Sequence, residues 1–426
     1  MAPVRGIFNA SGVSCHLSTA LLVLCHALKP ISDVLIRLSQ TDQADYYFRH
    51  LGLLFQKLGD DEDDEPVDPT SAYDIIETKV GVNSSDLGDA TSTLAKLLQS
   101  IREAPPASSV YLQPILNLTV DGGQIHSELT GYQLDELYPN SVNMRLKTLD
   151  SRPMPVPFSL PAKHSTLTQC LEAKLSPQDL RSYTWSGAFT ETVVSRDDVD
   201  TCNLKGRGWT TTRRIVVEKI PSVWILHLER FEYHDGRLEP LYHTVEIPEK
   251  LELGRSSICT SKDFVLAGGI LHVTDTEDID DPDNEGGHVV AVLRGAGDQW
   301  NLIDDEKVVK ICSKTALELF AGSKSQKALK GSFVCGVLLV YQNNASLEAT
   351  TSTLTAIMQQ LDKHLINWSD PNSLIGRRLR ILWSKGKLYP GRVIGYDSES
   401  GRHSVEYDDG DTKDYVLMRK TIEWEV

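Results

Sequence analysis

The sequence predicts an α+β fold in which helices come first and a mostly antiparallel sheet follows, with a small all-β module at the end of the chain. Three observations predict this order. Apolar residues recur at helical spacing from about residue 15 to residue 103. From about residue 109 onwards, short runs rich in β-branched and aromatic residues are bounded by turn residues. After residue 375 the strand-like runs are short and are joined by glycine-containing turns, which favours a small barrel.

The composition is typical of a globular protein. The chain has 426 residues, 40% of them hydrophobic and 24% charged, and this length suits one large and one small domain. The net charge of −16 argues against a protein that coats nucleic acid, because no global basic field would release counterions from phosphate. Seven cysteines without regular spacing predict reduced thiols rather than a disulfide framework. No signal peptide or membrane span is evident, so we expect a cytoplasmic or nuclear protein with no membrane partner.

The pattern divides the chain into three segments. Residues 1–342 are expected to form the main domain, residues 343–374 a partly helical linker, and residues 375–426 the small barrel. The expected helix in the linker runs from Leu354 to Ile366.

The first third of the main domain is predicted to be helical. A first helix follows Cys15 and ends at Pro30, because apolar residues recur along it every three or four positions. Further helical patterns lie at residues 31–58, 70–80 and 86–103, and Pro105-Pro106 ends the last of them. The acidic run at residues 60–65 is expected to be a solvated loop.

The strand pattern begins with Val110–Leu112 and is interrupted by one short helix, Leu167–Lys174. Val223–Leu228 is almost continuously apolar, which predicts a strand buried on both faces. The other expected strands of the main domain lie at residues 124–129, 158–160, 214–218, 264–273, 288–294, 299–303 and 333–341.

Three residues far apart in the sequence suggest a catalytic site. Cys15 stands at the start of a helix, where free backbone N–H groups and the helix dipole favour an anionic sulfur. His288 opens one strand and Asp304 ends the next, so adjacent strands would bring their side chains together. A nucleophile, a base and an orienting acid are the parts of a cysteine-hydrolase triad. From the residues alone, a buried core cysteine and a structural histidine remain alternatives.

Three stretches, in order across residues 5–342, resemble the ubiquitin-specific protease family of papain-like cysteine peptidases (ubiquitin carboxyl-terminal hydrolases). Residues 6–18 resemble its cysteine box, residues 220–231 its core strand, and residues 287–308 its histidine box. The resemblance implies a fingers-palm-thumb fold, with the helices as the thumb and the sheet as palm and fingers. It also implies cleavage of the (iso)peptide bond after the C-terminal glycine of ubiquitin, with ubiquitin or ubiquitinated proteins as partners.

Carried over by position, the resemblance makes Cys15 the nucleophile, His288 the base and Asp304 the orienting acid. Asp305 matches a position that supports the site in many members, and the alternative is a surface carboxylate at a strand end. The family's oxyanion asparagine matches Ala10, and Asn9 lies one residue earlier. Either a one-residue insertion still aims Asn9 at the oxyanion, or that donor is lost, at a cost on the order of 10²–10³ in rate.

Other departures from the family pattern bear on activity and metal content. His16 and Val289 stand where the family usually has tyrosines. A catalytically weak or inactive ubiquitin-binding scaffold, and a protease for another ubiquitin-like modifier, are therefore alternatives, although retention of all three triad residues favours a deubiquitinase. Many members bind zinc through two Cys-x-x-Cys pairs, and no such pair occurs here, so no metal or other cofactor is expected. The expected finger region instead holds the solitary cysteines Cys170 and Cys202 and the aromatic residues Trp185, Phe189 and Trp209.

The end of the chain, about residues 374–420, resembles a Tudor-type barrel. Such barrels can bind methylated lysine or arginine in aromatic cages, because ring faces attract a desolvated cation. Four residues fall at cage positions: Trp383, Tyr389, Tyr407 and Asp409. Asp411 stands where a further aromatic cage residue is expected, and the alternative is that Trp383 and Tyr407 only fill the barrel. The resemblance implies a recruiting domain for a methylated peptide or a chromatin protein.

Overall fold

The structure is a computed structural model, and it describes residues 4–9, 14–60, 65–83, 88–134, 142–180, 191–194, 210–234, 237–252, 263–275, 287–324, 332–368, 370–383, 387–417, 420 and 422–424. Ala10, Trp185, Phe189, Cys202 and Trp209 lie outside these residues, as do the larger parts of the acidic loops at 60–65 and 274–287.

The thumb is built from helices, as predicted. They are α1 (Cys15–Leu22), the π-helical turn η1 (Val23–Ala27), α2 (Lys29–Ser39), α3 (Tyr46–Leu58), α4 (Thr70–Val80), α5 (Ala90–Arg102) and α6 (Pro106–Thr119). Two starts are fixed by aspartates: Asp45 accepts a hydrogen bond from the Phe48 N–H at α3, and Asp89 accepts from two N–H groups at α5. Later helices are α7 (Leu167–Leu175), α8 (Ser313–Ala321), α9 (Asn344–Leu361) and the 3₁₀ turns η3 (Asp362–His364) and η4 (Pro371–Leu374).

The palm is a nine-stranded sheet in the order β14-β13-β12-β11-β16-β7-β3, with β10 beside β11 and β15 beside β16. Its pairs are antiparallel except β3 with β7. The strands are β3 (Phe158–Pro161), β7 (Val223–Glu229), β10 (Lys250–Glu252), β11 (Asp263–Asp275), β12 (His288–Arg294), β13 (Gln299–Asp304), β14 (Lys307–Cys312), β15 (Ser323–Lys324) and β16 (Ser332–Gln342).

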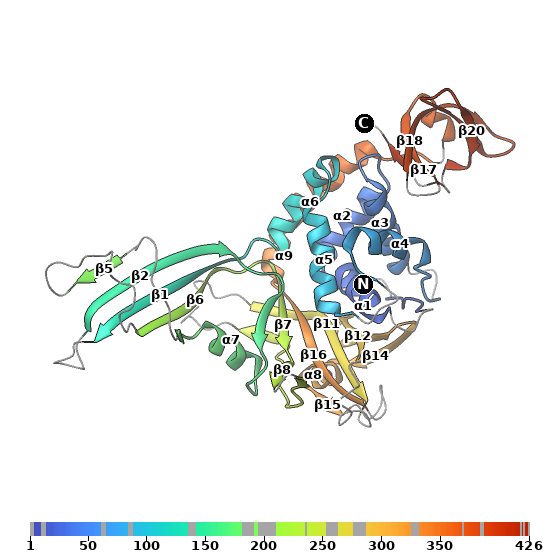
Figure 1. Ribbon diagram of the computed structural model, residues 1–426. Coiled ribbons are helices and arrows are strands. Elements are labelled where there is room, and N and C mark those ends of the chain that lie inside the picture. The colour runs from blue at the N-terminus through green and yellow to red at the C-terminus, as the bar shows by residue number, and fades with distance from the viewer. Residues whose placement is uncertain are drawn as a thin grey trace.

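The fingers are a second sheet that projects to one side of the body (Figure 1). Its order is β4-β6-β1-β2-β5, and all its pairs are antiparallel. The strands are β1 (Gln124–Leu134), β2 (Val142–Pro153), β4 (Gln178–Leu180), β5 (Glu191–Val194) and β6 (Thr210–Lys219), and a separate hairpin pairs β8 (Phe231–His234) with β9 (Arg237–Pro240). Figure 1 shows the thumb helices on the opposite side of the body, so the predicted fingers-palm-thumb layout is confirmed.

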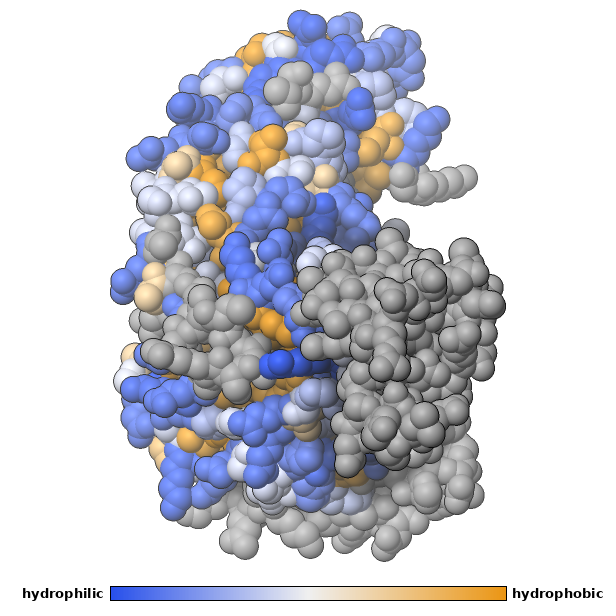
Figure 2. Space-filling model, turned by 90° about the vertical axis from the view of Figure 1, so that its left-hand side faces the viewer, coloured by the Kyte–Doolittle hydropathy of each residue, from blue (hydrophilic) through white to orange (hydrophobic). Residues whose placement is uncertain are grey.

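The palm sheet separates two hydrophobic cores. On β12, Val289 and Ala291 belong to the core with the thumb helices, whereas Val290 and Val292 belong to the core with α7 and α8. Val223–Leu228 alternates between the same two cores, as its apolar run predicted. The surface seen in Figure 2 is mostly hydrophilic where it is coloured, with apolar residues in small separate patches.

One expected strand is wrong. Val110–Leu112 lies inside α6, which starts with Pro106 at its first position. Tyr111, Leu112, Ile115 and Leu116 are buried at helical spacing. Burial of this face against the thumb core outweighs the strand propensity of the three residues read alone.

The segment expected to be a linker contains α9, which begins ten residues earlier than Leu354. Ile357 and Leu361 of this helix belong to the thumb core. After it, the Gln40 carbonyl accepts a hydrogen bond from the Ile366 N–H, and the His364 carbonyl accepts one from the Asp42 N–H. The chain after the palm is therefore joined to the α2–α3 connection of the thumb.

The end of the chain is a five-stranded antiparallel barrel in the order β20-β19-β18-β17-β21. Its strands are β17 (Arg378–Trp383), β18 (Lys387–Asp397), β19 (Arg402–Tyr407), β20 (Thr412–Tyr415) and β21 (Ile422–Trp424). It has its own core and lies beside the thumb (Figure 1).

No single helix in the described part of the chain is long and apolar enough to cross a membrane. The helical segments Cys15–Ala27 and Lys29–Ser39 reach the required length and hydropathy only when they are taken together, and the chain bends by 97° between them.

We expect Arg230→Lys to lower the free energy of unfolding of the main domain by about 2 kcal/mol or more. Arg230 is 1% exposed and donates hydrogen bonds to the backbone carbonyls of Gly336, His243, Phe320 and Ala321. A lysine ammonium has three donors and lacks the planar fork, so buried carbonyls lose their partners. Urea unfolding followed by tryptophan fluorescence measures the change.

Arg152→Lys is the matched control, because Arg152 is exposed on β2 and the same replacement there is expected to stay within about 0.5 kcal/mol. Equal unfolding midpoints for the two variants would contradict the structural role assigned to Arg230.

Candidate functional site

Cys15 is held at the seam between thumb and palm. It is the first residue of α1, is 5% exposed, and follows Ser14 at the N-cap position. All eight residues of α1 are buried, and Thr19 in its middle donates a hydrogen bond to the Val289 carbonyl of β12. The apolar face of the helix thus fixes the position of the sulfur against the palm.

A short N-terminal segment ties the same region together. The Ile7 N–H donates to the Asp305 carbonyl, and the Phe8 N–H donates to the carbonyl of Val67. A Cβ added at Gly6 would come within 2.5 Å of the carbonyl oxygens of Asp305 and Glu306. Glycine at position 6 therefore allows the segment to pass directly over the turn that follows β13.

His288 and Asp304 lie on neighbouring strands, as the sequence predicted. His288 opens β12 and Asp304 ends β13, and the two strands form an antiparallel pair. The Nε2 atom of His288 is 2.5 Å from Oδ1 of Asp304. The Cys15 side chain lies close enough to His288 to interact with its imidazole.

The two hydrogen bonds stabilise a charged imidazole. The bond to Asp304, followed by the bond to Cys15, raises the pKa of His288 to about 10. The same bond from His288 holds the pKa of Asp304 below its usual range. The structure thus brings Cys15, His288 and Asp304 into one relay of neighbouring side chains.

Asn9 and Asp305 form a second network beside the relay. The Asn9 side-chain amide donates to Oδ2 of Asp305 at 2.9 Å, and its oxygen accepts from the Ser14 hydroxyl at 2.7 Å and the Ser14 N–H at 3.3 Å. Burial raises the pKa of Asp305, in the opposite direction to its neighbour Asp304. The structure thus places Asn9 at the start of α1, and its oxyanion role stays a prediction because Ala10 lies outside the described residues.

Asp305 adopts an uncommon backbone conformation. Its φ is +51°, and no other non-glycine residue in the described ranges has a positive φ. Such a conformation costs on the order of 1 kcal/mol and persists only where the surroundings fix it. Here the fixing contacts are the Ile7 N–H on its carbonyl and the Asn9 amide on its carboxylate.

His272 is a site residue that sequence reasoning missed. It lies on β11 opposite Val289, and a Cβ added at Gly287 would come 1.8 Å from its Nε2. Burial, reinforced by the nearby charge of His288, lowers the pKa of His272 to about 4, so the ring is neutral. The available signal was Gly287 itself, because a glycine before the candidate base can mark a close approach of backbone and ring.

On the thumb side of the seam, His16 and Asp89 were not predicted as site residues. His16 is 2% exposed, and a Cβ added at Gly88 would come 2.6 Å from its ring. The two residues line a pocket between α1 and the α4–α5 connection, together with Gly81, Val82, Asn83, Gly88, Ser92, Thr93 and Lys96. The negative charge of Asp89 opposes the lowering of the His272 pKa, but its effect is smaller than those of burial and His288.

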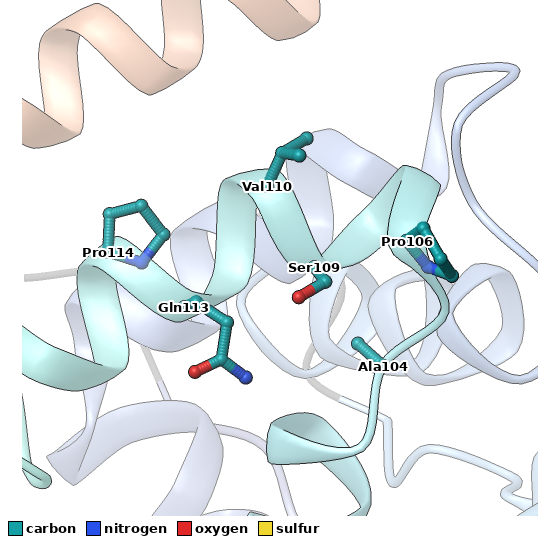
Figure 3. Close-up of a pocket in the computed structure, with 6 residues that line it drawn as sticks. All are labelled: Ala104, Pro106, Ser109, Val110, Gln113 and Pro114. Atoms are coloured by element: carbon teal, nitrogen blue, oxygen red, sulfur yellow. The ribbon is translucent and has the colours of Figure 1, made fainter.

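A second hollow on the thumb has no catalytic composition. It lies along the outer side of α6 and is lined by Ala104, Pro106, Ser109, Val110, Gln113 and Pro114 (Figure 3). None of these six residues is titratable, and Val110 is 62% exposed. This hollow is therefore not a candidate active site.

One group of side chains in the described residues is compact enough to hold a metal ion. It consists of His288, Asp304 and Asp305, whose potential ligand atoms all lie within 4.8 Å of one another. Hydrogen bonds already account for this arrangement, since Asp304 accepts from His288 and Asp305 accepts from Asn9. Cys170, which was expected in the finger region, is instead a buried thiol of α7 in the core against the palm sheet, and its sulfur contacts the His164 carbonyl.

In the barrel, three of the four predicted cage residues come together. The Trp383 ring centroid lies 4.8 Å from that of Tyr389 and 5.4 Å from that of Tyr407, and the Trp383 indole N–H donates to the Tyr407 hydroxyl. Tyr415, which was not predicted, extends the cluster by accepting a hydrogen bond from Tyr407. Asp409 lies in the β19–β20 turn and accepts from the Asp411 N–H, so its cage role stays a prediction.

Comparisons with known proteins place both parts of the chain. The family model described as ubiquitin carboxyl-terminal hydrolase matches residues 5–341, and the model described as PTM/DIR17-like, Tudor domain matches residues 376–417. Ubiquitin carboxyl-terminal hydrolase 4 of Arabidopsis thaliana is 23% identical over 279 residues, which are 63% of this chain and 65% of that protein. Probable ubiquitin carboxyl-terminal hydrolase creB of Aspergillus clavatus is 25% identical over 47% of this chain and 22% of its own length. The chain thus spans less than two thirds of either relative.

Among solved structures, the SAGA DUB module containing Ubp8 and bound to monoubiquitin has a TM-score of 0.55 at 18% identity, over 80% of this chain and 69% of that one. The SAGA Ubp8 module bound to ubiquitin aldehyde has a TM-score of 0.54 at 17% identity, over 80% and 70%. At these identities the likeness shows a shared fold.

We expect Asp304→Asn to lower the pKa of His288 from about 10 towards its ordinary value, because the Asp304 carboxylate is the largest cause of the rise. In the variant His288 therefore loses its proton at lower pH. An NMR titration of the histidine ring protons, with the His288 signal assigned by His288→Gln, measures the shift. Asp298→Asn, at an exposed turn position, is the control and should leave the His288 titration unchanged. An unchanged pKa in Asp304→Asn would contradict the relay.

Proposed function

We propose, since the chain belongs to the ubiquitin carboxyl-terminal hydrolase family, that it is a cysteine-type deubiquitinase that cleaves the (iso)peptide bond after the C-terminal glycine of ubiquitin. The observation that carries the proposal is the relay of Cys15, His288 and Asp304, formed by α1, β12 and β13. The relay has the nucleophile, base and orienting acid that acyl transfer requires.

The chemistry would take two steps. The Cys15 sulfur forms a bond to the glycine carbonyl carbon, and the carbonyl π electrons move to oxygen. These electrons then re-form the C=O bond as the C–N bond breaks, His288 gives its proton to the leaving amine, and a thioester on Cys15 remains. Water then attacks the thioester, His288 takes the proton from water, and the Cys15 thiolate leaves as the free carboxylate forms. Asp304 accepts the hydrogen bond from His288 throughout and stabilises the imidazolium.

We assign oxyanion stabilisation to the start of α1. Backbone N–H groups of a first helical turn lack partners within the helix and favour developing negative charge. Asn9 lies at this helix start, where Ser14 holds its oxygen and Asp305 holds its NH₂ group. The strained backbone at Asp305 would then serve to orient Asn9.

The seam between thumb and palm would receive the tail of ubiquitin. His272 lies against Gly287 on the palm side, and His16 lies against Gly88 on the thumb side. A channel closed in by two ring side chains suits glycine residues, which have no side chain to accommodate. The Ubp8 modules of similar fold are solved with monoubiquitin and with ubiquitin aldehyde, which supports ubiquitin as the partner proposed here.

For the C-terminal barrel we propose recruitment of a partner that carries a methylated lysine or arginine, such as a chromatin protein. The observation in favour is the cluster formed by the rings of Trp383, Tyr389, Tyr407 and Tyr415. Ring faces of this kind attract alkylated cations, which are weakly hydrated.

We expect a ubiquitin probe with a C-terminal electrophile to form an adduct with the wild-type chain under reducing conditions, and Cys15→Ala to abolish it. The adduct forms because the electrophile meets the sulfur at the position of the scissile carbonyl. Gel shift and intact mass spectrometry measure labelling. Cys312→Ala is the matched control, since Cys312 is a free and exposed thiol, and this variant should label like wild type.

Absence of an adduct with folded wild-type protein would contradict the proposed hydrolase activity and would favour the alternative of a ubiquitin-binding scaffold. Labelling by a probe built on another ubiquitin-like modifier, without labelling by the ubiquitin probe, would assign a different substrate class.

We expect Asn9→Ala to lower kcat by a factor on the order of 10²–10³, with little change in KM, because an oxyanion donor acts mainly in the transition state. Steady-state hydrolysis of a fluorogenic ubiquitin substrate measures both constants. Ser14→Ala removes the hydroxyl bond to the Asn9 oxygen but keeps the Asn9 amide, and it should cost much less. A loss for Asn9→Ala that falls on KM alone would contradict the oxyanion assignment.

A further inference from the structure

The aromatic cluster of the barrel already holds a cation of its own chain. The Nζ atom of Lys413, on β20, lies 3.8 Å from the centroid of the Trp383 ring. The carboxylate of Asp411 lies 3.5 Å from the same Nζ. A ring face on one side and a carboxylate on the other are the two elements by which an aromatic cage holds an alkylammonium group.

The strand geometry explains why Lys413 reaches the rings. Lys413 and Tyr415 are two residues apart on β20, and side chains at this spacing point to the same face of a strand. Tyr415 is joined to the cluster through the Tyr407 hydroxyl, so the face that carries it is the face of the cluster. The flexible stem of Lys413 then carries its ammonium over Trp383, while the side chain stays 42% exposed.

Two other lysines stand near rings of the cluster, but at greater distance. Lys387 lies 5.0 Å from the centroid of Tyr389, and Lys420 lies 5.1 Å from that of Tyr415. Among the cation–ring contacts of the described residues, that of Lys413 is the shortest. Of the three lysines near the cluster, Lys413 is also the one whose ring partner is a tryptophan, and a tryptophan face attracts cations most strongly.

We propose that Lys413 is a built-in competitor that occupies the barrel's alkylammonium site, and that a methylated lysine binds there by displacing it. This inference rests on the proposed role of the barrel as a cation-binding module. Because the ligand binds only the fraction of molecules in which Lys413 has left, the apparent Kd equals the intrinsic Kd divided by that fraction. A site closed nine-tenths of the time binds about tenfold more weakly than an open one. A methylated ammonium competes well with the Lys413 ammonium, because it is more weakly hydrated and therefore loses less hydration free energy when it moves onto a ring face.

The experiment uses the full chain labelled with 5-fluorotryptophan and observed by ¹⁹F NMR, with the Trp383 signal assigned by Trp383→Phe. Wild type, Lys413→Ala and Lys387→Ala are titrated with trimethyllysine amide and, separately, with unmodified lysine amide. Lys387→Ala is the matched control, because it removes the same charge from the same cluster at a longer ring distance. Unchanged thermal unfolding shows that each variant is folded.

The expected result is that Lys413→Ala binds trimethyllysine amide about tenfold more tightly than wild type, while Lys387→Ala binds like wild type and unmodified lysine amide binds each form more weakly. Adding Tyr389→Ala to Lys413→Ala should remove the gain. Equal, measurable affinities of wild type and Lys413→Ala would overturn the competitor while leaving the cation site. No binding by any form would overturn both. An equal gain in affinity for Lys387→Ala would show that the gain comes from the change in net charge. This result would overturn the proposal that Lys413 occupies the site.

Discussion

The candidate site depends on one constraint, the close contact between the start of α1 and the turn that ends β13. Gly6 passes directly over the carbonyls of Asp305 and Glu306, and the Ile7 N–H bonds to one of them. Thr19 joins the buried helix to the β12 backbone. Since the sulfur comes from α1 and the imidazole from β12, their distance is set by the packing of thumb on palm and not by either element alone.

This contact also explains how two neighbouring carboxylates differ. Asp304 accepts a hydrogen bond from a charged imidazole, which lowers its pKa, whereas burial raises the pKa of Asp305. The two environments therefore shift the pKa values of the two carboxyl groups in opposite directions, as in sites where paired carboxylates have distinct roles. Asp304 can orient and stabilise His288, and Asp305 can hold the amide of Asn9 at the helix start.

The sequence predicted the fold class and the neighbouring strand positions of His288 and Asp304, because these signals are local. His288 and Asp304 lie at strand ends within the stretch that resembles the histidine box of the family. Val223–Leu228 is apolar enough to indicate a strand buried on both faces. The prediction of a strand at Val110–Leu112 was wrong because burial of one face of α6 outweighs the local strand propensity of these residues. His272 and Lys413 were missed since each acts through a contact with a residue distant in the chain, Gly287 and Trp383 respectively.

The attachment of the barrel to the thumb also depends on contacts between residues that are distant in the chain. Asp42, in the connection between α2 and α3, pairs with Arg377 at the start of the barrel and lies 3.3 Å from His364. Buried Arg49 bonds the Thr41 carbonyl, and Glu423 on β21 adds to the negative charge around it. Charges from both domains thus compensate one another at a partly buried seam, where an unpaired partner would be costly. This shared network joins the barrel to the thumb through more than the covalent linker, which gives the ring cluster a defined position relative to the catalytic domain.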